Sequence, residues 1–175
     1  MSLINAKKEA DMKVVMVTHA KTTGKPPRRL SLTGEYQVEN IVDMIKGHMG
    51  AGYRITKAVS SSAARCLDTA LLCLEEIGAD DITRIETDTR LARLDSTDKL
   101  EGVIRDNAQE GLAIFCHADL ASALPQKERM TRVKDGWFEA RPVLAIIDWP
   151  PEKRWEEATI EALLTVPEDV SLLKG

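Results

Sequence analysis

Two histidines and one arginine follow short apolar or serine-rich runs, at positions where they could act together. His19 follows KVVMVT, His117 follows GLAIFC, and Arg65 comes three residues after the serines at 60–62. A neutral imidazole is a competent nucleophile toward phosphorus, and its usual pKa of about 6.5 leaves it largely unprotonated at neutral pH. An arginine can bind two phosphate oxygens, a second, protonated histidine can stabilise others, and a helix start after serines offers N–H groups to an anion. These residue types predict a site for phosphoryl chemistry.

The elements that must bring these residues together are visible in the hydrophobic pattern. Apolar runs of strand length alternate with stretches whose apolar residues recur at helical spacing. We expect strands at 13–18, 55–61, 82–88, 111–117 and 141–149, and helices at 33–49, 61–78, 98–109 and 152–164. This alternation predicts an α/β domain, a three-layer sandwich around a mostly parallel sheet. Ligands of such sheets bind beyond the carboxyl ends of the strands, where His19, Arg65 and His117 would meet.

Capping residues predict where two of these helices begin and end. Thr33 is placed to cap the first helix, and Glu35 suits the positive end of its dipole. A serine is placed to cap the second helix, which Gly78 would end. These boundaries put Arg65 in the first turn of the second helix.

Composition limits the class of protein. The chain has 175 residues, 43% of them hydrophobic, with a net charge of -4 and a sequence pI of about 5.5. We expect a single domain at 13–175, after an N-terminal extension at 1–12 that is disordered or partly left by cloning. The net charge argues against a nucleic-acid partner. The lack of a long apolar stretch argues against a membrane span or a signal peptide.

The three cysteines, Cys66, Cys73 and Cys116, show no metal-binding pattern. They cannot all pair within one chain, no CxxC is present, and together with His117 they lack the ligand spacing of a zinc site. We therefore expect reduced, mostly buried thiols in a cytoplasmic protein, and neither a metal nor a cofactor.

Four segments resemble, in the same order, motifs of the histidine phosphatase superfamily, whose fold is called phosphoglycerate mutase-like. VVMVTHA is similar to a strand ending in Arg-His-Gly, RLSLTGEYQVENI to a TxxGxxQ segment, VSSSAARCLDTALL to SSxxxR, and LAIFCHADLASAL to a strand ending in Ser-His. The resemblance runs from about residue 13 to about residue 124. It is strongest to the short bacterial phosphohistidine phosphatases, and it implies their fold and a phosphatase activity.

The resemblance also implies a role for each matching residue. His19 would be the histidine that becomes phosphorylated, Arg65 the arginine that clamps the phosphate, and His117 the second histidine of the phosphate pocket. Arg28, with Arg29 as its rival, falls near a further arginine of the short family members. The other phosphate contacts that we expect are Ser61, Ser62 and Thr18.

The sequence departs from the family pattern at three positions. Thr18 stands where the family has arginine, and the loss of one such donor costs roughly 3 kcal/mol of transition-state stabilisation. Ala20 replaces the glycine, and Arg93 stands where the family has its proton-donating glutamate. Asp95 is the nearest substitute for that acid, with Asp98 beyond it. Phosphohistidine needs less help from an acid than an alkyl phosphate does, because its leaving group is better.

A leading hypothesis and an alternative follow from these features. The leading one is hydrolysis of a phosphomonoester or protein phosphohistidine through phospho-His19, with a phosphorylated small molecule or a phosphohistidine protein as partner. The alternative, which Thr18 and Arg93 favour, is a catalytically impaired pseudophosphatase that binds a phosphorylated ligand or partner. Taken singly, His19 is a polar residue at a strand end and Arg65 is a helix-surface arginine that can pair with Asp68. Their occurrence together favours phosphate contact.

Overall fold

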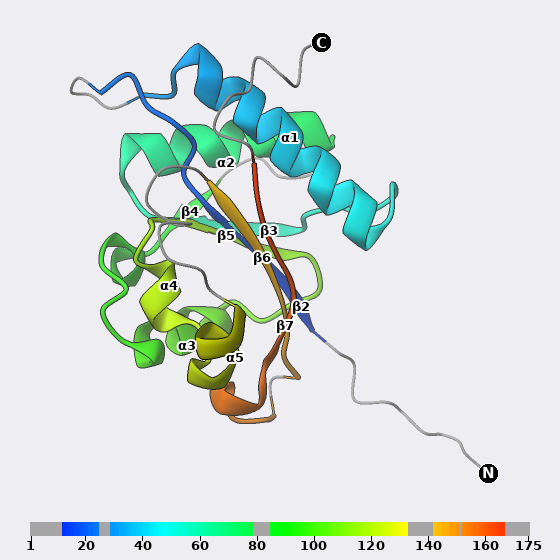
Figure 1. Ribbon diagram of the computed structural model, residues 1–175, viewed down its shortest axis with the longest axis vertical. Helices are drawn as coiled ribbons and strands as arrows, with labels where there is room; N and C mark the ends of the chain where they lie inside the picture. The colour runs from blue at the N-terminus through cyan, green and yellow to red at the C-terminus, as the bar shows by residue number, and fades with distance from the viewer. Residues whose placement is uncertain (1–11, 25–28, 79–84, 133–141, 151, 167–175) are drawn as a thin grey trace.

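The computed structural model describes residues 12–24, 29–78, 85–132, 142–150 and 152–166, and Figure 1 shows the elements that these residues form. The strands are β2 (Lys13–Thr18), β3 (Lys57–Ser60), β4 (Glu86–Thr87), β5 (Leu112–Cys116), β6 (Val143–Asp148) and β7 (Thr159–Thr165). The α-helices are α1 (Leu32–Met49), α2 (Ala64–Ile77), α3 (Thr97–Asp106), α4 (Leu120–Ala123) and α5 (Gln126–Arg132). The short 3-10 helices are η1 (Thr89–Ala92) and η2 (Trp155–Glu157).

The strands form one six-stranded sheet in the order β4-β3-β5-β2-β6-β7. The pairs β4–β3, β3–β5 and β5–β2 are parallel. Strand β6 lies antiparallel to β2, and β7 lies antiparallel to β6. The predicted α/β fold with a mostly parallel sheet is therefore confirmed, with two antiparallel strands at one edge.

The register aligns the carboxyl ends of the central strands. Thr18 lies opposite Cys116, and Ser60 lies opposite Phe115. The residues that follow continue this pairing, since His19 N–H donates to the Cys116 carbonyl at 3.0 Å and Ser61 N–H donates to the Phe115 carbonyl at 3.0 Å. The side chains beyond these strands are therefore held at one edge of the sheet.

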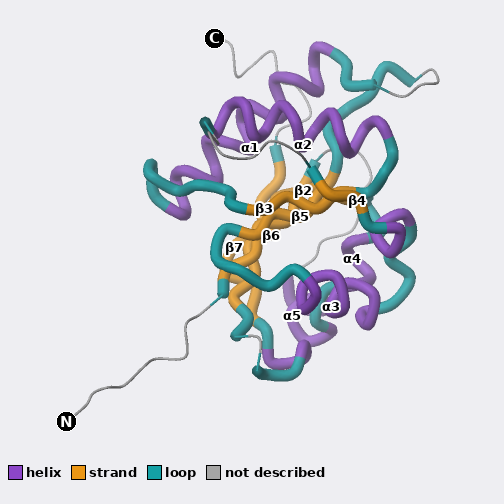
Figure 2. The backbone as a smooth tube through the Cα atoms, turned by 180° about the vertical axis from the view of Figure 1, so that it is seen from behind, coloured by secondary structure: helices purple, strands orange, loops and turns teal. Residues whose placement is uncertain are grey.

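Helices cover both faces of the sheet. Helices α1 and α2 lie on one face, and α3, α4 and α5 lie on the other, as Figures 1 and 2 show. Strand β2 contributes to both cores by alternation, because Val15 and Val17 pack on the α1 and α2 side while Val14 and Met16 pack on the α3 side. A strand that is buried on both faces has a continuous apolar sequence, which makes the run KVVMVT easy to recognise.

The prediction of a helix over 152–164 is wrong. The chain there forms the short η2 helix and then strand β7, which pairs with β6 along its length. Ile160 and Ala162 are buried whereas Thr159 and Glu161 are exposed, so burial follows the period of a strand. Pairing with β7 also satisfies backbone groups of β6 that an open sheet edge would leave unpaired. This gain outweighs the helical propensity of the segment.

The predicted cap of the first helix is also corrected. Helix α1 begins at Leu32 after Ser31, whose Oγ accepts a hydrogen bond from Gly34 N–H at 3.1 Å. Ser31, and not Thr33, is therefore the cap, because the helix starts two residues earlier than the prediction needs. The polar helix expected at 98–109 is present as α3.

Helix α2 lacks the predicted serine cap. It begins after Ala63, and no side-chain hydrogen bond caps it. The nearest serine contact lies before the helix, where Ala63 N–H donates to Ser61 Oγ at 3.3 Å. The predicted end of the helix is confirmed, since Gly78 adopts a left-handed conformation with φ of 79° that favours glycine.

Several predicted features lie outside the described residues. These are Arg28, the first part of the strand expected at 82–88, and residues 1–11 of the expected extension. Strand β4 (Glu86–Thr87) is the part of the 82–88 strand that the structure describes. In the described part of the chain, no helix combines the length and the apolarity that a membrane span requires.

Candidate active site

Two histidine rings face each other at the carboxyl edge of the sheet. His19 follows β2 and His117 follows β5, which are neighbouring strands. Their ring centroids are 5.6 Å apart, and their planes are inclined by 71°. The parallel pairing of β2 and β5 thus brings together two residues from distant parts of the sequence.

His117 is held between Arg65 and Ser61. Arg65 Nη2 lies 3.3 Å from His117 Nδ1, and Ser61 Oγ lies 2.8 Å from His117 Nε2. A guanidinium can only donate, so Nδ1 accepts, the ring proton is on Nε2, and Nε2 donates to Ser61 Oγ. Ser61 is buried, whereas Ser62, also expected to bind phosphate, is exposed in the turn before α2.

The environment of His117 keeps its ring neutral. Burial lowers the pKa of His117 to about 4, Arg65 and His19 act in the same direction, and Asp119 opposes them. The expectation of a protonated second histidine is therefore wrong for this arrangement. At neutral pH, His117 is a hydrogen-bonding group, and the positive charge beside it is that of Arg65.

His19 is oriented by the backbone that follows it. Its Nδ1 lies 3.0 Å from the Ala20 carbonyl oxygen, which can only accept, so in the neutral ring the lone pair is on Nε2. Ala20 N–H donates to Thr69 Oγ1 at 3.1 Å, and the Thr69 hydroxyl donates to the Arg65 carbonyl at 2.8 Å. A buried threonine of α2 thus ties the His19 loop to the helix turn that carries Arg65.

The start of α1 fixes the residue that follows Ala20. Lys21 N–H donates to Gln37 Oε1 at 2.9 Å, and the Lys21 carbonyl accepts from Ser31 N–H at 3.0 Å. A Cβ at Gly34 would collide with that carbonyl, so only glycine fits there. These contacts explain the glycine and the glutamine of LTGEYQ. Neither is among the site residues predicted from the sequence, although the segment that contains them carries the family resemblance.

Thr18 makes a contact that differs from the expected one. Thr18 is 2% exposed, and its Oγ1 accepts from the N–H of Val143, the first residue of β6, at 2.8 Å. The hydroxyl thereby satisfies a backbone donor at the point where β2 ends. The structure thus gives Thr18 a structural contact as an acceptor, and its predicted phosphate contact stays a prediction.

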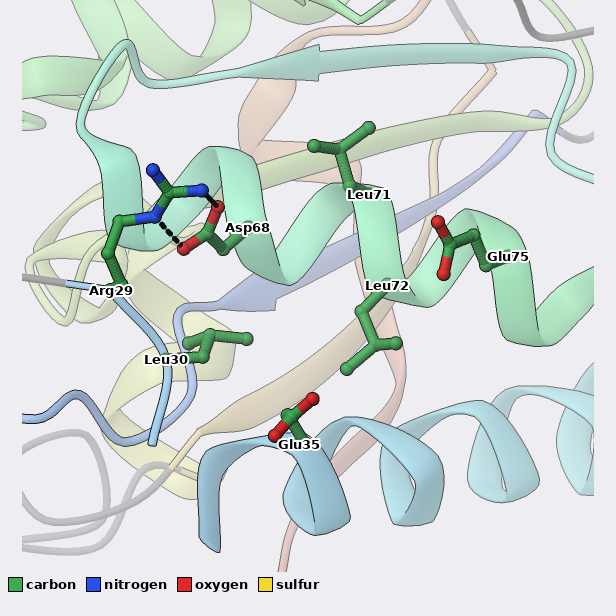
Figure 3. Close-up of a pocket in the computed structure, with 7 residues that line it drawn as sticks. All are labelled: Arg29, Leu30, Glu35, Asp68, Leu71, Leu72 and Glu75. Atoms are coloured by element: carbon green, nitrogen blue, oxygen red, sulfur yellow. Dashed lines mark hydrogen bonds and ion pairs between the residues drawn. The ribbon is translucent and has the colours of Figure 1, made fainter. Parts of the chain in front are cut away.

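Arg29 is bound to Asp68. Its Nε and Nη2 donate to the two carboxylate oxygens of Asp68 at 2.6 and 2.7 Å, as Figure 3 shows. Because this fork occupies Asp68, the alternative in which Asp68 pairs with Arg65 is wrong, and Arg65 contacts His117 instead. Arg28, the preferred of the two loop arginines, lies outside the described residues.

Asp95, the expected proton donor, is exposed and ion-paired. Its carboxylate lies 2.9 Å from Lys99 Nζ and 3.6 Å from Arg93 Nε. The hydrogen bond from Lys99 lowers the pKa of Asp95, so this carboxylate is ionised at neutral pH. An ionised carboxylate cannot donate a proton, and Asp95 therefore suits that role poorly.

Asp119 is a carboxylate near the site that the sequence reasoning does not single out. Its Oδ2 accepts from Leu94 N–H at 2.8 Å, and its Oδ1 is buried without a hydrogen-bond partner among the described residues. Its negative charge raises the pKa of His117, against the larger effect of burial. The available signal is its position, two residues beyond a histidine at a strand end.

A buried thiol contacts the same imidazole. Cys66 Sγ lies 3.7 Å from His117 Nδ1 and 3.6 Å from Nε2. Burial raises the pKa of Cys66 to about 12, so the thiol is neutral and a poor nucleophile at neutral pH. All three cysteines are unpaired and buried, as expected. Within the described ranges, no three His, Cys, Asp or Glu side chains are grouped to hold a metal ion.

Solved structures share this architecture over nearly their whole length. A protein assigned as the phosphohistidine phosphatase SixA from Agrobacterium tumefaciens aligns with 89% of this chain and 98% of its own, with a TM-score of 0.64 and 20% identity. The protein histidine phosphatase SixA complexed with tungstate covers 88% of this chain and 97% of its own, with a TM-score of 0.62 and 14% identity. A mycobacterial glucosyl-3-phosphoglycerate phosphatase covers 87% and 98%, with a TM-score of 0.56 and 13% identity.

The likeness is one of three-dimensional structure. No protein-family model matches the sequence, and no curated protein sequence matches it. At these sequence identities the agreement shows the fold. The chain has the fold of the histidine phosphatase superfamily, which it shares with SixA phosphohistidine phosphatases.

Proposed function

We propose that this protein hydrolyses a phosphomonoester or a protein phosphohistidine through a phospho-His19 intermediate. The observation that supports this most is the grouping of His19, His117 and Arg65, with the rings 5.6 Å apart and Arg65 3.3 Å from His117. The tungstate bound to SixA, a protein of the same fold, is a phosphate-like oxyanion, which also supports an oxyanion site in this architecture.

In the first step, the Nε2 lone pair of His19 attacks the phosphorus. The bond between phosphorus and the leaving group breaks, and the leaving group departs with the electron pair and takes a proton from water. Arg65 stabilises the negative charge on the phosphoryl oxygens, and the Ser61 hydroxyl, which accepts from His117 Nε2–H, can donate its own proton to one of them.

In the second step, water attacks the phosphorus of phospho-His19. The phosphorus–nitrogen bond breaks, its electron pair returns to Nε2, and inorganic phosphate leaves while the attacking water gives up one proton to the solvent. The hydrogen bond from Nδ1 to the Ala20 carbonyl keeps the ring in the same tautomer and orientation through both steps.

The ionised state of Asp95, the expected proton donor, favours phosphohistidine over alkyl phosphates as the substrate. Asp95 is ionised and paired with Lys99, so it offers little proton donation to a leaving group. An alkoxide leaving group depends strongly on such a donor, whereas the imidazole of phosphohistidine is a better leaving group. The presence of Arg93 in place of the family's glutamate is therefore compatible with phosphohistidine chemistry.

The test is phosphate release from free phosphohistidine and from an aryl phosphate. We expect His19→Ala to abolish release, because no other group in the scheme attacks phosphorus. His48→Ala is the matched control, since His48 lies at the end of α1 and pairs with Glu161 at 3.7 Å. Undiminished turnover in His19→Ala would rule out the mechanism.

A pseudophosphatase that binds a phosphorylated ligand without turnover is the second candidate. Arg29 donates to Asp68, and Thr18 carries a neutral hydroxyl where the family has a guanidinium, which together reduce the charged donors offered to a phosphoryl group. Titration with tungstate, followed by NMR, tests binding directly. Binding without hydrolysis of either substrate favours this candidate, whereas turnover that His19→Ala abolishes rules it out.

A further inference from the structure

A groove lies between α1 and α2, beside the histidine site. Its volume is about 320 Å³, and Figure 3 shows the side chains that line it. Leu30 and Leu72 line it and are partly buried against the core under the two helices. Leu71 lines it as well and is 51% exposed, which is high for a leucine. We call this feature the α1–α2 groove.

The charged residues of the α1–α2 groove leave it negative. Glu35 of α1, Asp68 and Glu75 of α2, and Arg29 complete the lining. The fork between Arg29 and Asp68 cancels one pair of charges. Glu35 and Glu75, both exposed, remain as acidic residues on the two walls, as Figure 3 shows. The groove therefore offers apolar surface with an acidic rim.

The groove begins next to the residues that position His19. Asp68 precedes Thr69, whose hydroxyl accepts from the N–H of Ala20 at 3.1 Å. With a rise of about 1.5 Å per residue, the groove extends along α2 from about 5 Å to about 15 Å beyond Arg65. A molecule that fills the groove and also reaches His19 must therefore extend along nearly three turns of α2.

We propose that the α1–α2 groove is a docking site for a phosphohistidine-bearing protein that presents leucine-like and lysine or arginine side chains to it. This inference rests on the proposed function, since the bound protein would deliver its phosphohistidine to His19. Apolar side chains of the partner cover Leu71 and Leu72, and its cations face Glu35 and Glu75.

The negative charge of the groove favours a cationic protein segment over a small phosphorylated metabolite or a second copy of this chain. A nucleotide with several phosphates would place further negative groups against an acidic rim, and a phosphorylated sugar has no apolar side chain to cover Leu71. A second copy of this chain carries the same net charge of -4, so its surface is on average repelled. A cationic and apolar protein segment matches both the charge and the apolar floor of the groove.

The test compares two synthetic phosphohistidine peptides of equal length and helical propensity, each with two leucines. One carries lysines beside the leucines and the other carries glutamates, and free phosphohistidine is the third substrate. We expect the lysine peptide to have a KM about tenfold below that of the glutamate peptide, with a similar kcat. Free phosphohistidine, which does not reach the groove, should not respond to changes there.

Charge reversal in the groove should remove this preference. Glu35→Lys/Glu75→Lys is expected to equalise or invert the KM values of the two peptides, while kcat on free phosphohistidine stays unchanged. Glu152→Lys/Glu156→Lys is the matched control, because it changes the net charge equally at exposed positions that do not line the groove. The control should keep the wild-type preference.

Binding of the unphosphorylated lysine and glutamate peptides, measured by fluorescence anisotropy, decides the matter independently of turnover. Tighter binding of the lysine peptide, lost only in the groove variant, supports the docking site even if no substrate is hydrolysed and the proposed function fails. Equal binding of the two peptides, or the same loss in both double variants, overturns it even if free phosphohistidine is hydrolysed.

Discussion

The two sides of the histidine pair are built differently. On the side of β3 and β5, Ser61 and Arg65 both contact the ring of His117, and Cys66 packs against it. On the side of β6, Thr18 turns its hydroxyl to the backbone N–H of Val143 at 2.8 Å. The first side places polar and charged side chains around His117, whereas the second uses its polar group to join two strands.

The difference follows from strand direction. β5 and β3 run parallel to β2, so all three end at the same edge and the chain beyond them is available for ligand contacts. β6 runs antiparallel to β2 and begins where β2 ends, so the N–H of Val143 lies at this edge and needs an acceptor. Thr18 supplies that acceptor. A phosphoryl group bound here would therefore be held mainly from the Arg65 side.

The largest expected effect in this comparison comes from Arg65. Arg65→Ala removes the cation beside His117, and loss of a charged donor to a transition state costs about 3 to 4 kcal/mol. We expect kcat/KM for free phosphohistidine to fall by about 10² to 10³. Steady-state kinetics of purified variants measure this change.

Arg29→Ala is the matched control for that prediction. Arg29 is exposed and forked onto Asp68, so its removal should leave kcat/KM for free phosphohistidine within about threefold of the wild-type value. If Arg29→Ala were as damaging as Arg65→Ala, the phosphoryl group would be held from both sides, and the asymmetry described above would be wrong.

A smaller effect, on stability rather than on activity, is expected at Thr18. Thr18→Val keeps the shape of the side chain but leaves the buried N–H of Val143 without its acceptor, which costs about 1 to 3 kcal/mol of unfolding free energy. Urea denaturation measures this loss, and Thr18→Ser, which keeps the hydroxyl, is the control. A variant of unchanged stability but strongly reduced turnover would instead show that the Thr18 hydroxyl serves the substrate.

The sequence predicts the parts of this fold that depend on periodicity and chain order. Buried strands such as KVVMVT are continuous apolar runs, and the alternation of strands with helices implies the parallel edge where His19 and His117 meet. The prediction of a helix at 152–164 failed because the apolar residues of this segment fit the period of a strand as well as that of a helix. Its strand state depends on pairing with β6, which is a long-range contact.

The chemical details of the site depend on contacts that composition does not reveal. The neutral state of His117 follows from its burial and its neighbours Arg65 and His19, and Thr18 contacts a strand that begins far away in the sequence. The partner of Arg29 likewise required the packed position of Asp68 on α2. The types and order of the residues were predictable, but their partners were not.

The last prediction distinguishes the two sides by the pH dependence of stability. The pKa of His117 is lowered to about 4 in the folded protein, chiefly by burial, from an unfolded value of about 6.5. Between these values the unfolded chain binds more protons than the folded one, so His117 contributes stability above about pH 6.5 that is lost as the pH falls toward 4.

His117→Gln can keep hydrogen bonds to Ser61 and Arg65 but does not titrate. We therefore expect the free energy of unfolding to fall more steeply from pH 7 to pH 4.5 in the wild type than in this variant. Parallel curves from urea denaturation at several pH values would show that the pKa of His117 is not lowered on folding, whereas a shallower fall in the wild type would show that it is raised and that His117 shares the positive charge with Arg65.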